Sequence, residues 1–218
     1  MRKQRLSFLF VATLCSCGAM DEAATGSAAP GAVADSSAIG NGDTAADRKA
    51  PEPVPPCAAP TDVPAALAVP AGNYVKAAYF AQGVQIYTCQ PAAAPTQGYA
   101  WTLKAPDARL TDLSGATAGK HYAGPTWESN DGSKVVGAVL ARASAPEAGA
   151  VQWLLLRAAQ NGGEGVFANV TYVQRLHTSA GAAPATGCDA STIGAEVRMP
   201  YSTLYYYYTT NHNPTYQN

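Results

Sequence analysis

The sequence predicts a mainly β protein, an antiparallel sandwich or barrel with one short helix, preceded by a signal peptide and a disordered tether. After residue 70, short stretches rich in Val, Ile, Thr and Tyr alternate with clusters of Gly, Pro and Asp, which is the pattern of strands and turns. One segment alone has the length and composition of a helix, and a single crossover helix cannot build an alternating α/β domain. Residues 18–60 hold almost no large apolar side chains, so they cannot form a core.

The individual elements follow from this pattern. The helix is expected at Val151–Gln160 (VQWLLLRAAQ), and Asn161-Gly162-Gly163 would end it. In residues 169–176 neither face of the expected strand is wholly polar, so this strand is covered on both sides or lines a barrel. The expected strands are Asn73–Ala81, Val84–Cys89, Ala100–Lys104, Arg109–Leu113, Lys134–Ala143, Asn169–Leu176 and Arg198–Thr209.

The N-terminus has the pattern of an export signal. A basic start precedes a short apolar run at residues 6–14, and small or cysteine residues follow. Leu14-Cys15-Ser16-Cys17 resembles a bacterial lipobox, which would make Cys17 the lipidated first residue of the mature chain; ordinary cleavage near Ala19 or Ala24 is the alternative. We therefore expect an outer-membrane or cell-surface lipoprotein, or a secreted protein, whose contact with the membrane is through a lipid anchor only.

The expected domain organisation follows from the composition along the chain. Residues 1–17 form the signal peptide, 18–60 a disordered Ala/Gly/Pro-rich tether, 61–210 a single β domain and 211–218 a flexible C-terminal tail. The charges nearly cancel, with 14 Lys and Arg against 15 Asp and Glu, and only 13% of residues are charged. This field is too weak to gather a polyanion, so no nucleic-acid partner is expected. Residues 40–45 spell GxGxxA, but no strand or helix pattern flanks them, so no cofactor is expected.

Three cysteines follow the signal segment: Cys57, Cys89 and Cys188. An oxidising export compartment favours pairing two of them. A Cys89–Cys188 disulfide would close a loop of about 100 residues and stabilise the fold by roughly 3–5 kcal/mol. Cys57–Cys188 is the rival pairing, and the spacing leaves both open.

Several short motifs occur together in one order along the chain. They are GVQIYTC at residues 83–89, Trp101, HYAGPTWE at 121–128, DGSKVVG at 131–137, WLLLRA at 153–158, VTYVQR at 170–175, Pro184, Cys188-Asp189-Ala190 and the run from Pro200 to Tyr208. Over about residues 60–209 the chain therefore resembles the family of the domain of unknown function 3455. The resemblance implies an exported bacterial or fungal protein with no established activity. Some relatives carry a dehydrogenase label, which the lack of a dinucleotide-binding fold here does not support.

The densest group of polar and aromatic residues is the segment His121–Asp131, which is expected to be a loop. As a ligand site, Tyr122 and Trp127 would stack on a sugar or other flat ligand, while Glu128 and Asp131 would accept hydrogen bonds from its hydroxyl groups. As a structural element, Asp131 would make a turn, Trp127 would fill the core and His121 would bond a backbone carbonyl. We favour the structural interpretation, because turn chemistry explains the Asp-Gly and Gly-Pro pairs without a ligand.

No catalytic motif is present, so no catalytic residue is predicted. His121, Glu128 and Asp131 are the candidates if the protein is a hydrolase. The sequence has neither the HxH nor the HExxH spacing that would indicate a metal site.

Residues 201–208 hold five of the twelve tyrosines, and alternate rings of a strand point to opposite faces. One set of rings can fill the core, and the other set is either exposed or packed against a neighbouring element. We favour packing against a neighbouring element.

The preferred function is a non-enzymatic binding or surface module with a glycan or protein ligand at the cell surface. The first alternative is an exported hydrolase acting on a carbohydrate or similar envelope substrate. The second is a structural coat or adhesive component that assembles through its tyrosines.

Overall fold

The computed structural model describes residues 58–94 and 96–211. The expected signal peptide (1–17), the lipidation site Cys17 and residues 18–57 of the expected tether lie outside the described residues, as do residues 212–218 of the expected C-terminal tail. Cys57, the rival partner for Cys188, also lies outside them. No helix in the described segments is long and apolar enough to cross a bilayer.

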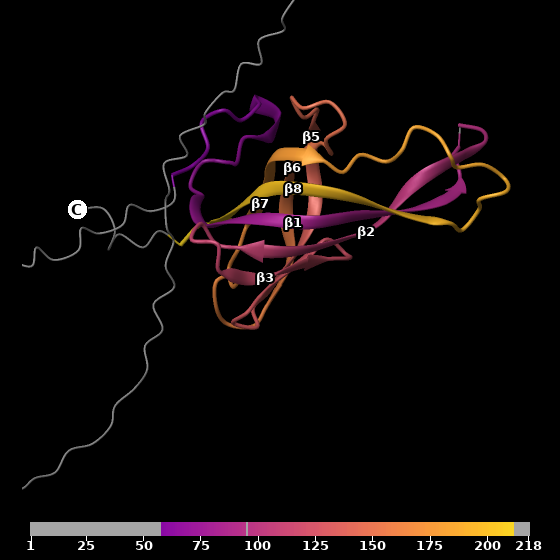
Figure 1. Ribbon diagram of the computed structural model, residues 1–218. Helices are drawn as coiled ribbons and strands as arrows, with labels where there is room; N and C mark the ends of the chain where they lie inside the picture. The colour runs from indigo at the N-terminus through magenta and orange to yellow at the C-terminus, as the bar shows by residue number, and fades with distance from the viewer. Residues whose placement is uncertain (1–57, 95, 212–218) are drawn as a thin grey trace, which may run out of the picture.

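One antiparallel sheet makes up the domain, and it closes on itself as a barrel (Figure 1). Each strand pairs with the next one along the chain, and β1 also pairs with β8. A 3₁₀ turn, η1 (Ala65–Leu67), precedes the sheet. The strands are β1 (Tyr74–Pro91), β2 (Tyr99–Thr111), β3 (Thr117–Tyr122), β4 (Thr126–Ser129), β5 (Lys134–Ala143), β6 (Trp153–Gly162), β7 (Tyr172–Ala180) and β8 (Glu196–Thr209).

The helix expected at Val151–Gln160 is wrong, because this segment forms β6. Its apolar run is buried on both faces: Leu154 and Leu156 belong to the core inside the barrel, whereas Trp153 and Leu155 belong to a second cluster on the outside. A strand buried on both faces has no alternation of polar and apolar residues, and a short apolar run of this kind cannot be told from a buried helix by periodicity.

Two pairs of expected strands are each one continuous strand. Residues 74–81 and 84–89 both belong to β1, and residues 100–104 and 109–111 both belong to β2. The expected strands ran one residue too far at residue 73 and two too far at residues 112 and 113. Gly83 does not interrupt β1 but allows β2 to approach it. An added Cβ at Gly83 would lie 2.1 Å from the carbonyl oxygen of Asp107. The glycine is thus required for close packing of two strands and does not mark a turn.

The barrel is filled and closed at one end. Tyr205 and Tyr207 from β8 and Trp127 from β4 are the largest buried side chains of its core. Phe167, from the loop between β6 and β7, is fully buried beside Tyr79 and Tyr207. This loop therefore seals the end of the barrel at which β1 begins.

A second cluster lies on the outer surface of β6, β7 and β8. Leu67 of η1 packs there with Trp153, Leu155 and Leu176. Gln174 connects the two layers, since its Nε2 donates to the carbonyl oxygen of Leu67 (2.7 Å) while its Oε1 accepts from the Tyr208 hydroxyl. The segment before β1 thus covers one side of the barrel. Apolar residues occur on both faces of β7, because it lines the barrel on one side and lies under this segment on the other.

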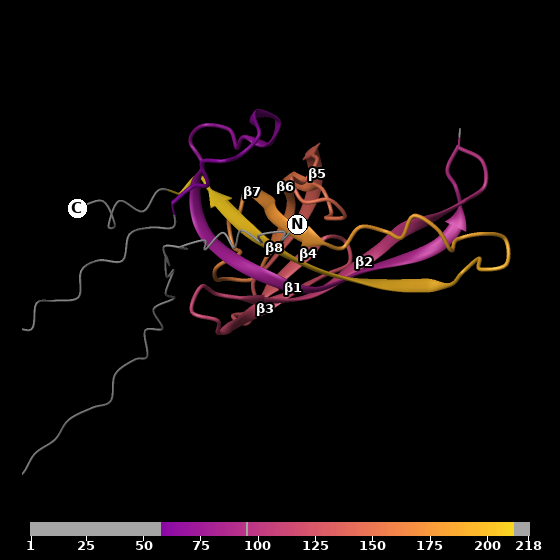
Figure 2. The same ribbon diagram turned by 45° about the horizontal axis from the view of Figure 1, so that its top comes forward.

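At the opposite end, β1, β2 and β8 continue well beyond the other strands (Figure 2). The connection from β7 to β8 runs beside this extension. A disulfide between Cys89 on β1 and Cys188 in the connection holds the two together, as does a hydrogen bond from Trp101 Nε1 to the carbonyl oxygen of Thr186 (3.0 Å). The disulfide is one of the two pairings considered from the sequence. The extension forms one wall of the open end of the barrel.

Candidate functional site

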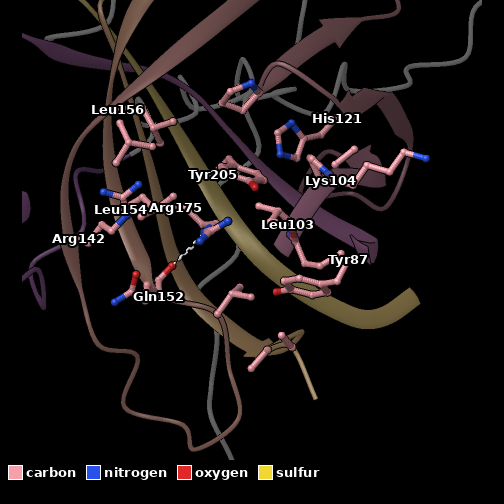
Figure 3. A pocket seen from close by; sticks show the side chains of 18 of the residues that line it. Tyr87, Leu103, Lys104, His121, Arg142, Gln152, Leu154, Leu156, Arg175 and Tyr205 are labelled. Atoms are coloured by element: carbon pink, nitrogen blue, oxygen red, sulfur yellow. Dashed lines mark hydrogen bonds between the residues drawn. The ribbon is translucent and has the colours of Figure 1, made fainter. Parts of the chain in front are cut away.

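The open end of the barrel contains a cavity of about 470 Å³ (Figure 3). This volume lies in the range of sites that bind small molecules. Gln85 and Tyr87 line it on β1, whereas Tyr79, farther back along the same face of β1, contacts Phe167 at the sealed end. The cavity therefore enters the barrel interior from one side only.

Aromatic rings form the inner wall of this cavity. His121 from β3 stacks on Trp127 from β4, with ring centroids 4.4 Å apart and planes 6° apart. Tyr205 from β8 meets both rings edge-on, with centroids 5.1 Å from each. The rest of the wall is mostly apolar and includes Leu154 and Leu156 from β6. Such a wall can contact the apolar body of a ligand.

His121 is a neutral side chain in this wall. It is 2% exposed, and its Nδ1 lies 2.8 Å from the carbonyl oxygen of Thr126. Burial lowers the pKa of His121 to about 3; the charge of Arg175 also lowers it, while the Thr126 hydrogen bond raises it. A carbonyl can only accept, so Nδ1 carries the proton and Nε2 keeps its lone pair. His121 therefore offers the cavity an acceptor and no positive charge at neutral pH.

Cationic side chains stand at the other side of the cavity. Arg175 from β7 donates from Nε and Nη2 to the carbonyl oxygen of Gln152, at 3.0 and 2.8 Å (Figure 3). Arg142 from β5 and Lys104 from β2 also line the cavity, and Lys104 pairs with Glu196. No Asp or Glu is among the lining residues in the part of the chain that the structure describes. The polar part of the site therefore favours a negatively charged group.

Two of the lining residues carry buried polar atoms without a hydrogen-bond partner. These atoms are Gln85 Nε2 and Trp127 Nε1. Burial raises the pKa of Tyr205, and this rise is opposed by the charge of Arg175 and by side-chain hydrogen bonds with Tyr201 and Arg175. Buried polar groups in folded proteins are nearly always paired, and a ligand or water in an adjacent cavity is an ordinary partner.

The segment expected to be a binding loop is instead a β-hairpin, and its residues point in different directions. β3 ends at Tyr122 and β4 begins at Thr126. His121 and Trp127 face the interior of the barrel and line the cavity. Tyr122 and Glu128 are their neighbours in sequence and so lie on the outer face. The structure thus brings His121 and Trp127 together and separates them from the other candidates.

Glu128 is held on this outer face by three side chains. The Tyr122 hydroxyl donates to its Oε2 (2.7 Å), and the ammonium groups of Lys134 and Lys120 lie 3.2 and 3.6 Å from the same oxygen. The Tyr122 hydrogen bond lowers the pKa of Glu128, burial opposes this, and the two lysines lower it further. The arrangement is a surface cluster around a carboxylate that stays ionised.

Asp131 lies at the sealed end of the barrel, in the turn between β4 and β5. Its Oδ1 accepts from the backbone N–H (2.9 Å) and the hydroxyl (2.6 Å) of Ser133, and its Oδ2 accepts from the N–H of Val166 (2.8 Å). Burial acts to raise the pKa of Asp131, but these hydrogen bonds outweigh it and lower the pKa. Ser133 in turn accepts from the N–H of Phe167 (2.9 Å). Asp131 therefore supports the loop that carries Phe167.

The tyrosines of β8 are divided between the two faces of the sheet, as the alternation predicts. Tyr201, Tyr205 and Tyr207 lie in the barrel core, and Tyr206 packs against the outer cluster around Leu67. Tyr208 is 4% exposed. Both sets are therefore packed against other parts of the protein, and this strand presents no open tyrosine surface.

Among the described residues, no three His, Cys, Asp or Glu side chains come together as ligands for a metal ion.

The residues that sequence reasoning missed are those that line the cavity from distant strands, above all Gln85, Arg142 and Arg175. Arg175 carried a local signal, since a charged residue stands two positions after Val173, on the same face of the expected strand. No local signal marks Gln85 or Arg142. Arg142 comes near Arg175 only when β5, β6 and β7 pair, and Gln85 only when β1 pairs with β8 and closes the barrel.

Comparisons with curated proteins and with solved structures gave no match to this chain. The comparison with protein families gave one, over residues 70–209, which is more than half of the chain and extends from just before β1 to the end of β8. The whole barrel is therefore the family's domain, and the chain belongs to the family described as Protein of unknown function (DUF3455).

Proposed function

We propose that this domain is a non-enzymatic binding module that takes one small amphipathic molecule into the open end of its barrel. The observation that carries the proposal is the cavity of about 470 Å³, with aromatic and aliphatic side chains on most of its wall and a few polar groups at its mouth. Small-molecule sites have this composition, in which apolar contact supplies affinity and a few polar groups fix orientation.

The barrel architecture supports this use of the cavity. An eight-stranded barrel is just wide enough for side chains to fill it or for one small ligand to be held inside. Here the sealed half is filled by Phe167, Tyr207 and their neighbours, while the open half is not filled. The fold alone does not specify a function, so the proposal depends on the cavity.

A hydrolase is less well supported. Glycoside hydrolysis needs two carboxyl groups facing one cleft. Glu128 is bound by Tyr122 and two lysines on the outer face, Asp131 supports the loop at the sealed end, and no carboxylate lines the cavity among the described residues. The ligand proposed here is a small molecule inside the barrel, whereas the sequence predicted a glycan or protein ligand at the His121–Asp131 segment. The placement of the domain at the cell surface remains part of the proposal, carried by the N-terminal sequence.

The test uses the full chain and a neutral dye, N-phenyl-1-naphthylamine, whose emission rises in apolar surroundings. We expect saturable binding with one site per chain. Val139→Phe places a larger side chain in the cavity wall and should weaken binding about tenfold or more. Leu140→Phe is the matched control, because Leu140 is 53% exposed and does not line the cavity. Absence of saturable dye binding, or equal weakening by both variants, would refute the proposal.

A further inference from the structure

We infer that the ligand of this cavity is an amphipathic organic acid, and that Arg175 and Arg142 bind its anionic head group. The inference rests on the proposed function, since it specifies the chemistry of the molecule that the cavity holds. It is drawn from the arrangement of charge around the cavity and from the donors that the protein leaves unused.

Arg175 has hydrogen-bonding capacity left after its contacts within the protein. A guanidinium group carries five N–H donors in a planar fork. Two of them, on Nε and Nη2, bind the Gln152 carbonyl oxygen, and this contact holds the side chain in place at the cavity. A neutral carbonyl does not balance the positive charge. Arg175 is therefore oriented in advance, with donors still available for a second group.

Arg142 lies close enough to act on the same group. In the strand register, Arg142 of β5 pairs with Leu154 of β6, and Leu154 also pairs with Arg175 of β7. The two arginines are thus separated by two strand spacings, about 10 Å between their backbones. Both line the cavity, and their guanidinium groups lie on the same side of it, next to Gln152 (Figure 3). Side chains of this length can reach one head group from both sides.

Nothing in the described part of the chain neutralises this pair. Arg142 and Arg175 make no ion pair with a described carboxylate, and Asp and Glu are missing from the lining residues described. The effect of Arg175 extends into the cavity, where its charge acts to lower the pKa of His121, Tyr87 and Tyr205. Two like charges side by side repel each other, and an anion between them removes that repulsion.

The rest of the wall determines what is attached to the anionic group. Beyond Arg175 the cavity continues to Leu156, Trp127 and Tyr205, which offer apolar and aromatic surface. A small inorganic anion would leave this surface in contact with water, whereas the apolar body of an organic acid would cover it. A planar carboxylate matches the fork of Arg175, and a sulfate ester presents the same charge with tetrahedral geometry.

The experiment compares compounds that share a ten-carbon chain and differ in head group. Decanoate, decyl sulfate, decan-1-ol and decylamine are each titrated against the dye bound to the full chain, at low ionic strength. We expect decanoate to bind about tenfold or more tightly than decanol and decylamine, because hydrogen bonds between a carboxylate and a guanidinium group are stronger than those of neutral groups. Tighter binding of decanoate than of decyl sulfate assigns a carboxylate, and the reverse order assigns a sulfate ester.

Two arginine variants then assign the residues. Arg175→Gln should weaken decanoate binding about tenfold and leave decanol binding unchanged, and Arg142→Gln, which removes an exposed side chain, should weaken decanoate binding about threefold. Arg157→Gln is the matched control, since Arg157 is exposed on β6 and does not line the cavity. Circular dichroism checks that each variant is folded.

The outcomes separate this inference from the proposed function. If the dye and decanol bind but decanoate binds no tighter than decanol, or if the arginine variants weaken both equally, the cavity is a neutral site and the inference is wrong. If neither the dye nor any ten-carbon compound binds, the proposed function fails as well.

Discussion

Mild acid should destabilise this protein through one buried side chain, His121. Its pKa in the folded state is about 3, compared with an ordinary value of 6.5 in the unfolded chain. Between these two values the unfolded state binds one more proton than the folded state. The free energy of unfolding therefore falls as the pH falls through 6.5, approaching about 1.4 kcal/mol for each pH unit. The stabilising contribution of the neutral ring is complete only above pH 6.5.

From pH 7.5 to pH 5.5 this linkage amounts to about 1.4 kcal/mol. With a urea dependence of about 2 kcal/mol per molar, the unfolding midpoint should move down by about 0.7 M. Urea titrations at intervals of half a pH unit, followed by tryptophan fluorescence, measure this shift. The carboxylates with lowered pKa values, among them Asp112 and Asp131, take up their protons at lower pH and lie outside this window.

Replacement of the ring tests the assignment. His121→Gln retains a donor for the Thr126 carbonyl but cannot titrate, so its midpoint should stay constant between pH 7.5 and 5.5, whatever its absolute stability. His177→Gln is the control, because His177 is exposed on the outer surface, and it should keep the full dependence on pH. A wild-type protein with constant stability over this range would contradict the reasoning, as would a His121→Gln variant that keeps the same slope.

Three further predictions concern stability. Replacing both Cys89 and Cys188 by Ala should lower the free energy of unfolding by roughly 3–5 kcal/mol, because the disulfide closes a loop across 99 positions. Reduction of the wild-type disulfide should give the same loss in urea titrations, and a loss below about 1 kcal/mol would contradict this prediction. Gly83→Ala should cost about 1–3 kcal/mol, since its Cβ would meet the backbone of β2, whereas Gly162→Ala, with open space around it, should stay within about 0.5 kcal/mol in thermal unfolding. Asp131→Ala should cost about 1–3 kcal/mol and speed amide exchange at the loop that seals the barrel, and unchanged exchange there would refute its role.

The two ends of the barrel divide structural and binding roles between residues that are close in sequence. Asp131 and Ser133 support the sealing loop, and His121 and Trp127, a few positions earlier, form the wall of the cavity. The short strand β4 runs from the cavity toward the sealed end. Each residue of a strand advances about 3.3 Å, so residues a few positions apart lie at different ends of the barrel. The segment His121–Asp131 therefore contributes both to the stability of the sealed end and to the wall of the cavity.

The β class of this protein and the alternation of its tyrosines could be predicted from the sequence alone. These properties depend on local composition and on the two-residue period of a strand, which a single segment carries within itself. The sequence left two possible disulfide pairings. It could not select between them, because the spacing of cysteines along the chain does not show which of them are close together in the folded protein.

Three features were decided only by the tertiary structure: the strand at 153–162, the opposite directions of Trp127 and Glu128, and the cavity itself. Leu154 and Leu155 suit a buried helix as well as a strand, and only pairing with β5 and β7 selects the strand. The site joins Gln85, His121, Arg175 and Tyr205 from four strands. No local pattern links residues so far apart in sequence, since they become neighbours only when β1 pairs with β8 and closes the barrel.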